Sequence, residues 1–481
     1  MALGSDSDGY GSKADSSTSS TADYDVVILG GGSGGYACAL RSAQLGMTVA
    51  VIEDDKLGGT CLHRGCIPTK ALLHAAEVAD EVRGGPDIGI VSRLDGIDMA
   101  KVNSYQNGVV SRLHKGLVSL VNNAGSGSGS IETISGRGHM SGPTSVRVGD
   151  REVTGSHVVL ATGSVPRLPD GVSAGDRAFT SDEALTLTEV PGSAVIIGGS
   201  VIGVEFASIW RSFGAEVTVV EALDRLVPQE DPAMSKQLAR AFRKRGIKTH
   251  TSSMLKGIEQ HGDQVTATLD DGTSVDADVA LLAIGRGPNS VGLGLDDHGV
   301  DTDRGWVTTD ERLRTSAAGV YAVGDLVPGP QLAHRGFAHG IFVAEDIAGL
   351  HPVPIIDTDI PRVTYCDPQI ASVGLTEPQA IAQYGEDDVR VYEYNLAGNG
   401  KSQILRTGGI VRAIRRTDGP IVGVHMIGAR FGEQIGEASL LVNWDAFPED
   451  LASVIHAHPT QNEALGEVAM ALAGKPLHAP A

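Results

Sequence analysis

At 481 residues, the chain is too long for a single hydrophobic core and predicts three or four structural units. Hydrophobic residues make up 41% and charged residues 20%, which is typical of a soluble globular protein, and no apolar run approaches the roughly 18 residues of a membrane span. The formal net charge of −21 argues against a nucleic-acid partner, because the sequence offers no basic stripe to phosphates.

The cysteine count and the N-terminal composition both bear on the cellular compartment. Four cysteines do not make a disulfide scaffold, so a reducing cytoplasm is expected. Residues 1–22 are rich in Ser, Gly and Asp, which predicts a disordered tail without the apolar core of a signal peptide. The Gly/Ser run at 125–130 predicts a flexible loop.

The first motif is a glycine-rich turn between two apolar segments. A strand expected at 26–29 leads into Gly30-x-Gly32-x-x-Gly35, a helical stretch and a second strand at 49–52 that ends at Glu53. Glycines in this register allow a tight turn and a close approach to a pyrophosphate, while the acid can accept hydrogen bonds from a ribose. The segment therefore predicts a dinucleotide-binding unit.

The cysteine pair follows this unit. Residues 58–70 read GGTCLHRGCIPTK, with Cys61 and Cys66 five positions apart. In an ideal helix such residues have Cα atoms about 8.6 Å apart, whereas a disulfide needs about 4.4–6.8 Å. A bridge would therefore require irregular backbone, which Gly65 and Pro68 are expected to supply. A zinc site is disfavoured because no second pair of ligands exists, and a redox pair is favoured over a structural staple, since so short a loop constrains little entropy.

The glycine-rich pattern recurs about 170 residues later as Gly198-x-Ser200-x-x-Gly203, followed by a strand that ends at Glu221. Ser200 replaces the middle glycine. The acid favours NAD over NADP, although Arg225 nearby weakens that preference slightly. Two such units indicate two bound dinucleotides; a duplicated enzyme that binds one nicotinamide is the alternative.

Further segments complete a resemblance. Cys-x₄-Cys-x-Pro-x-Lys after an N-terminal glycine-rich unit resembles the flavoprotein disulfide reductases, and most closely their dihydrolipoyl dehydrogenase group, over residues 23 to 475. The same resemblance extends to VLATGS at 159–164, LLAIGRGPN at 281–289, VYAVGD at 320–325, LAHRG from Leu332, PRVTYCDPQIASVGLTE at 361–377 and HAHPTQNE at 456–463.

The resemblance implies an α/β fold with two Rossmann-like dinucleotide-binding domains and a C-terminal α+β dimerisation domain, assembled as a homodimer. The implied domains are a tail (1–22), the first part of the FAD-binding domain (23–167), the NAD-binding domain (168–295), a central region with the second part of the FAD-binding domain (296–360) and the dimerisation domain (361–481).

The implied activity is NAD-linked reoxidation of dihydrolipoamide through FAD. Cys61 would be the interchange thiol and Cys66 the thiol beside the flavin. The lipoyl group would belong to an acyltransferase subunit of a 2-oxo acid dehydrogenase complex. The alternatives are an NAD(P)H-dependent reductase of another disulfide or of quinones, and a non-catalytic subunit that retains the fold.

Other roles follow from the resemblance as well. His458, oriented by Glu463, would be the acid/base group of the partner subunit's active site, and Lys70 would lie near the flavin, ion-paired with Glu205. His63 and Arg64, where Asn-Val is common, are expected to tune redox potential or lipoyl access. The implied cofactor contacts are Gly30, Gly32, Ser33, Gly35, Glu53, Thr60, Lys70, Gly138, Thr162, Gly163, Ser164, Asp325 and Ala333, and, in the second unit, Gly198, Gly199, Ser200, Gly203, Glu221 and Gly285; no metal is expected.

Overall fold

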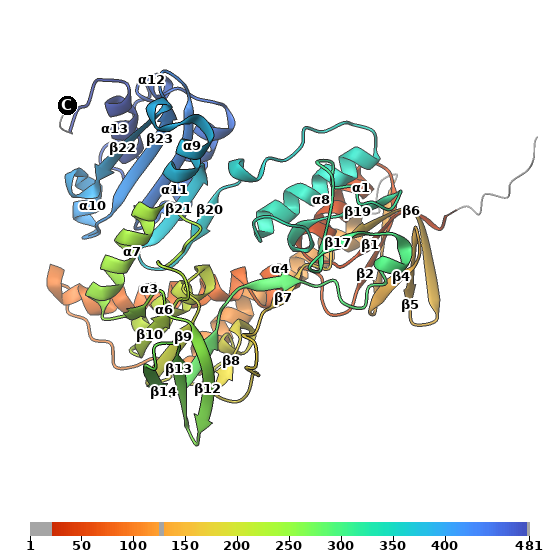
Figure 1. The fold of residues 1–481 in the computed structure, drawn as a ribbon, viewed down its shortest axis with the longest axis horizontal. Coiled ribbons are helices and arrows are strands. Elements are labelled where there is room, and N and C mark those ends of the chain that lie inside the picture. The colour runs from red at the N-terminus through yellow and green to blue at the C-terminus, as the bar shows by residue number, and fades with distance from the viewer. Residues whose placement is uncertain (1–21, 125–128, 479–481) are drawn as a thin grey trace, which may run out of the picture.

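The computed structural model describes residues 22–124 and 129–478. Residues 1–21 of the predicted tail and 125–128 of the predicted loop lie outside the described residues. The chain forms three units built around separate sheets, and the second unit is inserted between two parts of the first (Figure 1). None of the helices in the described ranges combines the length and apolar character needed to cross a bilayer.

The first unit is built on a parallel sheet whose central strands are apolar throughout. Residues 26–29 and 49–52 are buried on both faces, one against helices and the other against the antiparallel strands and residues 293–327. An antiparallel extension continues the sheet beyond β6. The strand order is β3 (Ser130–Ser135), β2 (Thr48–Glu53), β1 (Tyr24–Leu29), β6 (Arg151–Leu160), β5 (Ser145–Val148) and β4 (Gly138–Gly142), with β19 (Val320–Ala322) also paired to β6.

Two helices of this unit begin at distant places in the chain but cross closely. These are α1 (Ser33–Gln44) and α8 (Ala333–Ile347). A Cβ on Gly340 would lie 2.2 Å from the Gly34 carbonyl oxygen, and one on Gly336 would lie 2.6 Å from Ser33 Oγ. Small residues thus bring the two helices together, with both N-termini at the same cavity.

The second unit repeats the parallel arrangement. Its sheet has the order β11 (Lys248–His250), β10 (Glu216–Val220), β9 (Ser193–Ile197), β15 (Val279–Leu282) and β8 (Ala178–Phe179), with α6 (Val201–Phe213) and α7 (Pro232–Arg245) alongside. An antiparallel sheet of β12 (Leu255–His261), β13 (Gln264–Leu269) and β14 (Ser274–Ala277) is appended.

A short ladder joins the first two units. β7 (Ser164–Pro166) follows the last residues of β6, and β16 (Arg286–Pro288) follows β15; the two pair antiparallel, with Ser164 opposite Pro288. The chain therefore leaves the first unit through β7 and returns to it through β16, and these two crossings lie side by side.

The third unit is an antiparallel sheet with helices. Its order is β20 (Arg362–Thr364), β21 (Gln369–Gly374), β24 (Ile421–Gly428), β23 (Ile410–Arg416) and β22 (Val389–Asn395), with α11 (Phe431–Asn443) and α13 (Glu463–Leu472) packed on it. This arrangement, with the two parallel sheets, confirms the predicted fold class. The predicted boundaries at 167, 295 and 360 fall between elements of these sheets and stay a prediction.

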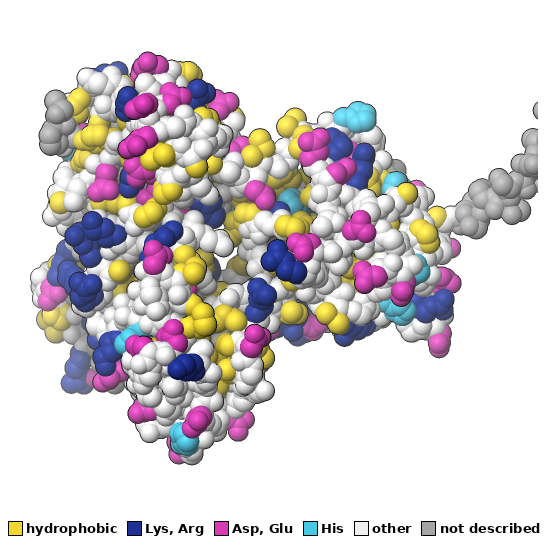
Figure 2. Space-filling view, viewed as in Figure 1, with side chains coloured by type: hydrophobic (Ala, Val, Ile, Leu, Met, Phe, Trp, Pro, Cys, Tyr) yellow, Lys and Arg dark blue, Asp and Glu magenta, His cyan; other side chains and the backbone are white. Residues whose placement is uncertain are grey.

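The two remaining cysteines are core residues. Cys38 in α1 is fully buried, and Cys366 packs where α6 meets the third sheet. Burial raises the pKa of both thiols, that of Cys38 to about 12, so both stay neutral. On the face in Figure 2, Asp and Glu side chains are scattered among Lys and Arg instead of gathering in one patch.

Candidate active site

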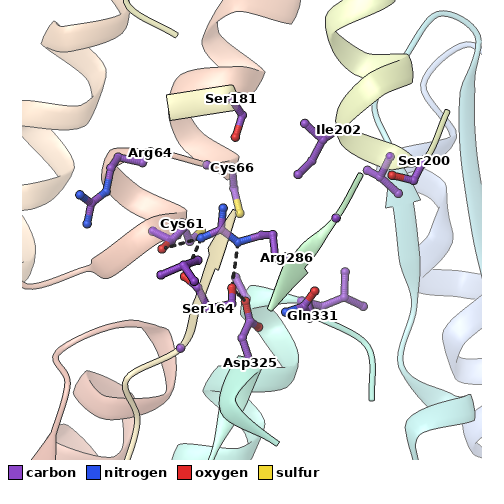
Figure 3. A pocket seen from close by; sticks show the side chains of 18 of the residues that line it. Cys61, Arg64, Cys66, Ser164, Ser181, Ser200, Ile202, Arg286, Asp325 and Gln331 are labelled. Atoms are coloured by element: carbon purple, nitrogen blue, oxygen red, sulfur yellow. Dashed lines mark hydrogen bonds between the residues drawn. The ribbon is translucent and has the colours of Figure 1, made fainter. Parts of the chain in front are cut away.

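One cavity of about 1550 Å³ connects the two glycine-rich turns and the cysteine pair. Residues of all three units line it, and Figure 3 shows part of this lining around Cys61 and Cys66. This volume exceeds the roughly 300–1,000 Å³ of a typical single small-molecule site, which leaves room for more than one ligand.

Glycines let the first turn pack tightly against the end of β6 and the start of α1. Gly30 has φ +106°, and a Cβ there would lie 2.4 Å from the Ala161 carbonyl oxygen. A Cβ on Gly35 would lie 1.8 Å from the Gly30 carbonyl oxygen. Gly32 occupies the N-cap of α1 and carries no side chain, so the first N–H groups of the helix face the cavity. These groups fit a pyrophosphate.

Glu53 closes this turn from the neighbouring strand. Its Oε2 accepts a hydrogen bond from the Gly31 N–H (2.6 Å), and its Oε1 accepts one from the Asp55 N–H (2.9 Å). Burial raises the pKa of Glu53, and these two hydrogen bonds lower it by less. The carboxylate thus fixes the turn while lining the cavity, where its remaining lone pairs fit ribose hydroxyls.

The second turn repeats these contacts one for one. Glu221 Oε2 accepts from the Gly199 N–H (2.6 Å) and Oε1 from the Leu223 N–H (2.8 Å). Ser200 takes the N-cap of α6 with φ −82°, which any residue adopts, so the change from glycine has no backbone cost. Arg225 is turned toward Asp224 and the Pro228 carbonyl oxygen.

The cysteine pair lies across a break between two helices. Cys61 is in α2 (Gly59–His63) and Cys66 is the first residue of α3 (Cys66–Gly84). Arg64 and Gly65 leave the helical conformation between them, as predicted. The expectation for Pro68 is wrong: it lies in the first turn of α3, where a helix needs no N–H from it.

Both cysteines are free thiols in the structure, and each acts on the pKa of the other. The hydrogen bond from Cys61 is the main cause that lowers the pKa of Cys66 to about 7; burial opposes it and the Lys70 charge adds to it. The same hydrogen bond and burial raise the pKa of Cys61. Cys66 is therefore the sulfur that is more readily a thiolate.

Lys70, one turn after Cys66, is held by two residues from other units. Its ammonium donates to both oxygens of Glu205 at 2.9 Å, so the pair implied by the resemblance is present. Burial lowers the pKa of Lys70, but the Glu205 carboxylate raises it by more. Tyr365 from the third unit places its ring 4.8 Å from the ammonium.

Arg286 lies under the cysteine pair. Its guanidinium donates to Ser164 Oγ (2.8 Å) and to the Ser164 carbonyl oxygen (2.7 Å), and Ser164 Oγ donates to Asp325 Oδ2 (2.8 Å) (Figure 3). Burial lowers the pKa of Arg286 and raises that of Asp325. The sequence reasoning missed Arg286 and Tyr365, although both stand in the motifs that carried the resemblance.

Most implied cofactor contacts line the cavity. Gly35, Gly199 and Gly203 do not; they lie behind the turns, and a Cβ on Gly203 would lie 1.9 Å from the Gly198 carbonyl oxygen. The positions that line it are Gly30, Gly32, Ser33, Glu53, Thr60, Lys70, Gly138, Thr162, Gly163, Ser164, Asp325, Ala333, Gly198, Ser200, Glu221 and Gly285.

His63 and Arg64 point to different surroundings. His63 Nε2 lies 2.9 Å from the Leu57 carbonyl oxygen, and its ring meets His114 edge-on at 4.9 Å. Arg64 lines the cavity and pairs with Asp55 at 3.4 Å, with half of its side chain exposed. His63 is thus a packing residue of α2, and only Arg64 faces the cavity.

His458 and Glu463 form a pair outside the cavity of their own chain. His458 Nδ1 lies 2.8 Å from Glu463 Oε1, and Glu463 Oε2 accepts from the Thr460 N–H at 2.7 Å. Burial raises the pKa of Glu463, but these two partners lower it by more. The His458 side chain is 76% exposed and lines no part of the cavity. His456 pairs instead with Glu437.

Comparison with known proteins agrees with this geometry. The model of the pyridine nucleotide-disulphide oxidoreductases matches residues 24–340, and that of the family's dimerisation domain matches residues 360–469. The chain is 39% identical to a dihydrolipoyl dehydrogenase of Bacillus subtilis, over 95% of this chain and 99% of that protein. It is 38% identical to the mitochondrial dihydrolipoyl dehydrogenase of Pisum sativum, over 95% and 93%.

Two solved structures share the whole architecture. LpdA from Mycobacterium tuberculosis superposes with a TM-score of 0.85 at 27% identity, over 93% of this chain and 99% of that chain. The HOCl-induced flavoprotein disulfide reductase RclA from Escherichia coli has a TM-score of 0.82 at 27% identity, with the same coverage.

Proposed function

Because the chain belongs to the pyridine nucleotide-disulphide oxidoreductase family, we propose that it is an NAD-linked, FAD-dependent dihydrolipoyl dehydrogenase. One observation carries the proposal: a pair of cysteines with a cation beside it lies in one cavity with two dinucleotide-binding turns. The identity of 36–39% to proteins of that name supports the substrate.

The cysteine pair carries the thiol chemistry. In the oxidised enzyme, a thiolate of dihydrolipoamide attacks Cys61 Sγ; the Cys61–Cys66 bond breaks and Cys66 leaves as a thiolate. The second substrate thiol then displaces Cys61, so the substrate is oxidised to a disulfide and the protein pair gains two electrons. The low pKa of Cys66, about 7, supports its role as the leaving thiolate.

FAD, when bound, supplies the two-electron carrier between this dithiol and NAD⁺. The first glycine-rich turn, Glu53 and Asp325 would hold it, and the second turn with Glu221 would hold NAD. The remaining cavity positions named above are part of the same proposal. Lys70 would face the flavin, with its charge balanced by Glu205.

The proton of the substrate thiol needs a base, and we assign this role to His458. Glu463 holds its Nδ1 side, which leaves Nε2 for the substrate. Because His458 is outside the cavity of its own chain, it would act in the active site of a second subunit. The match to the family's dimerisation domain supports this homodimer.

The lipoyl group would come from an acyltransferase subunit of a 2-oxo acid dehydrogenase complex in the cytoplasm. A lipoylated acyltransferase domain should then be a better substrate than free dihydrolipoamide at equal concentration. Equal kcat/KM for both would remove the partner from the proposal and leave the thiol chemistry in place.

A substrate panel tests the function. Purified holoenzyme is assayed with lipoamide, oxidised glutathione, oxidised mycothiol and quinones, each with NADH and with NADPH. We expect the highest kcat/KM with lipoamide and NADH. A higher value with another disulfide or a quinone would refute the substrate, and no activity with any acceptor would identify a non-catalytic subunit.

A spectroscopic measurement tests the site separately. Two-electron reduction of the holoenzyme should produce a long-wavelength thiolate-to-flavin absorption, because Cys66 would lie beside the flavin. Cys66→Ser should lose this absorption while Cys38→Ser, a change in the buried core, should keep it. The absorption persisting in Cys66→Ser would assign the role to Cys61.

A further inference from the structure

The Lys70 ammonium is enclosed by a carboxylate and by an aromatic face. Glu205 binds it through both oxygens at 2.9 Å, and the Tyr365 ring centroid lies 4.8 Å from Nζ. Within about 6 Å of a ring face, an ammonium is attracted by the ring's negative face. Because 31% of the Lys70 side chain is exposed, this attraction adds to an ion pair that solvent would otherwise loosen.

Backbone contacts set the position of Tyr365 without using its side chain. The Tyr365 N–H donates to Glu205 Oε1 at 2.9 Å, and the Asp367 N–H donates to Ser208 Oγ at 3.1 Å. Both bonds join the segment after β20 to α6. A substitution at residue 365 therefore leaves the segment attached and changes what faces Lys70 and the neighbouring Gly432 of α11.

The ring, and not the hydroxyl, makes the contact. Within residues 22–124 and 129–478, no hydrogen bond of the Tyr365 hydroxyl is observed, whereas its backbone and ring both have partners. Burial raises the pKa of Tyr365, so the phenol is neutral near neutral pH. Phenylalanine is thus a matched control for the ring.

The position of Lys70 matters to Cys66. The Lys70 charge lowers the pKa of Cys66, and Glu205 raises it. Two cations, Lys70 and Arg286, and one carboxylate, Glu205, therefore act on this sulfur, together with its partner thiol. The groups that face Cys66 are Cys61 from α2, Lys70 from α3, Glu205 from α6, Arg286 from β16 and Tyr365 from the segment after β20.

We propose that Tyr365 is a positioning residue whose ring face holds the Lys70 ammonium beside Cys66, so that the cation stabilises the Cys66 thiolate. The inference rests on the proposed function, since the thiolate forms when the pair is reduced. It also gives the third unit a part in the redox centre, because Tyr365 directly follows the first strand of that unit's sheet.

The test is a pH titration of the two-electron-reduced holoenzyme for wild type, Tyr365→Phe and Tyr365→Leu. The long-wavelength thiolate-to-flavin absorption reports the Cys66 thiolate. We expect Tyr365→Phe to titrate as wild type. In Tyr365→Leu the midpoint should move up by about half a pH unit, which is about threefold less thiolate below the midpoint.

Two outcomes would overturn the inference: Tyr365→Leu titrating as wild type, or Tyr365→Phe moving as far as Tyr365→Leu. Should Tyr365→Leu lose its flavin, Tyr365→Met fills the same space without a ring, and the same criteria apply to it. Absence of the absorption in wild type would instead refute the proposed role of Cys66, so the two failures are distinguishable.

Discussion

Acid should loosen the first unit through one buried histidine. His339 in α8 is 2% exposed, and its Nδ1 accepts a hydrogen bond from the Gly324 N–H at 3.3 Å. Burial, and then the Arg335 charge, lower the pKa of His339 from 6.5 to about 3. A protonated ring cannot accept this bond, and the residue next to Gly324 is Asp325, which lines the cavity.

Proton linkage gives the sign and the size of the change in stability with pH. The unfolded chain binds a proton at this histidine below pH 6.5, whereas the folded chain binds it only near pH 3. The contribution of His339 to stability is therefore complete above pH 6.5 and is lost as the pH falls. Between pH 8 and pH 5 the loss is about 1.5 pKa units, or about 2 kcal/mol.

The assay is the urea midpoint of flavin release at pH 8 and pH 5, at fixed subunit concentration with excess FAD. His339→Asn keeps an acceptor for the Gly324 N–H but cannot be protonated. We expect the urea midpoint of His339→Asn to fall less on acidification than that of wild type. The difference in urea concentration should be about 2 kcal/mol divided by the measured m-value, the slope of the free energy of unfolding against urea concentration. His261→Asn, on an exposed hairpin, is the control and should behave as wild type. Equal pH dependence in His339→Asn and wild type would refute the reasoning.

Three other substitutions have clear expected outcomes. Glu221→Ala should raise the Kd for NADH about tenfold, since a charged acceptor of two backbone N–H groups is lost; unchanged affinity in a calorimetric titration would contradict this. Gly35→Ala should yield protein without FAD, because its Cβ would lie 1.8 Å from a carbonyl oxygen. Its control is Gly116→Ala in the interior of α4 (Met99–Asn123), where no atom lies within 4 Å of the added Cβ; this variant should keep FAD and gain about 0.5–1 kcal/mol of stability. The flavin-to-protein absorbance ratio and the melting temperature measure the two effects. His458→Gln should lower lipoamide turnover by about 10²-fold or more, with anaerobic flavin reduction by NADH at the wild-type rate; a dimer with full lipoamide activity would remove His458 from catalysis.

The glycine-rich turns were predictable because their determinants are local. Each acid lies 22 positions after the glycine whose N–H it accepts, within a single strand–helix–strand unit. The break between the thiols was also local, since Gly65 stands in it. The expectation of irregular backbone at Pro68 was wrong because a proline can either end a helix or begin one, and the sequence does not show where α3 starts.

Arg286 and Tyr365 were not predictable in the same way. Arg286 reaches Thr60 across 226 positions, and Tyr365 reaches Glu205 across 160. Neither belongs to a spacing or periodicity, and each acquires its role only when separate units meet at the cavity. His339 is similar, because a histidine in a helix gives no sign that it will be buried against a turn from another segment.

The way the first sheet is completed sets an order for synthesis. β19 pairs with β6, and α8 packs on α1, but the whole second sheet is encoded between β6 and β19. On the ribosome, the second unit can therefore fold while β6 still has an open edge and the FAD side of the cavity lacks Asp325 and α8. A chain that stops before residue 320 should have a folded nicotinamide unit and no flavin, so flavin capture marks the nascent chain that has passed this point.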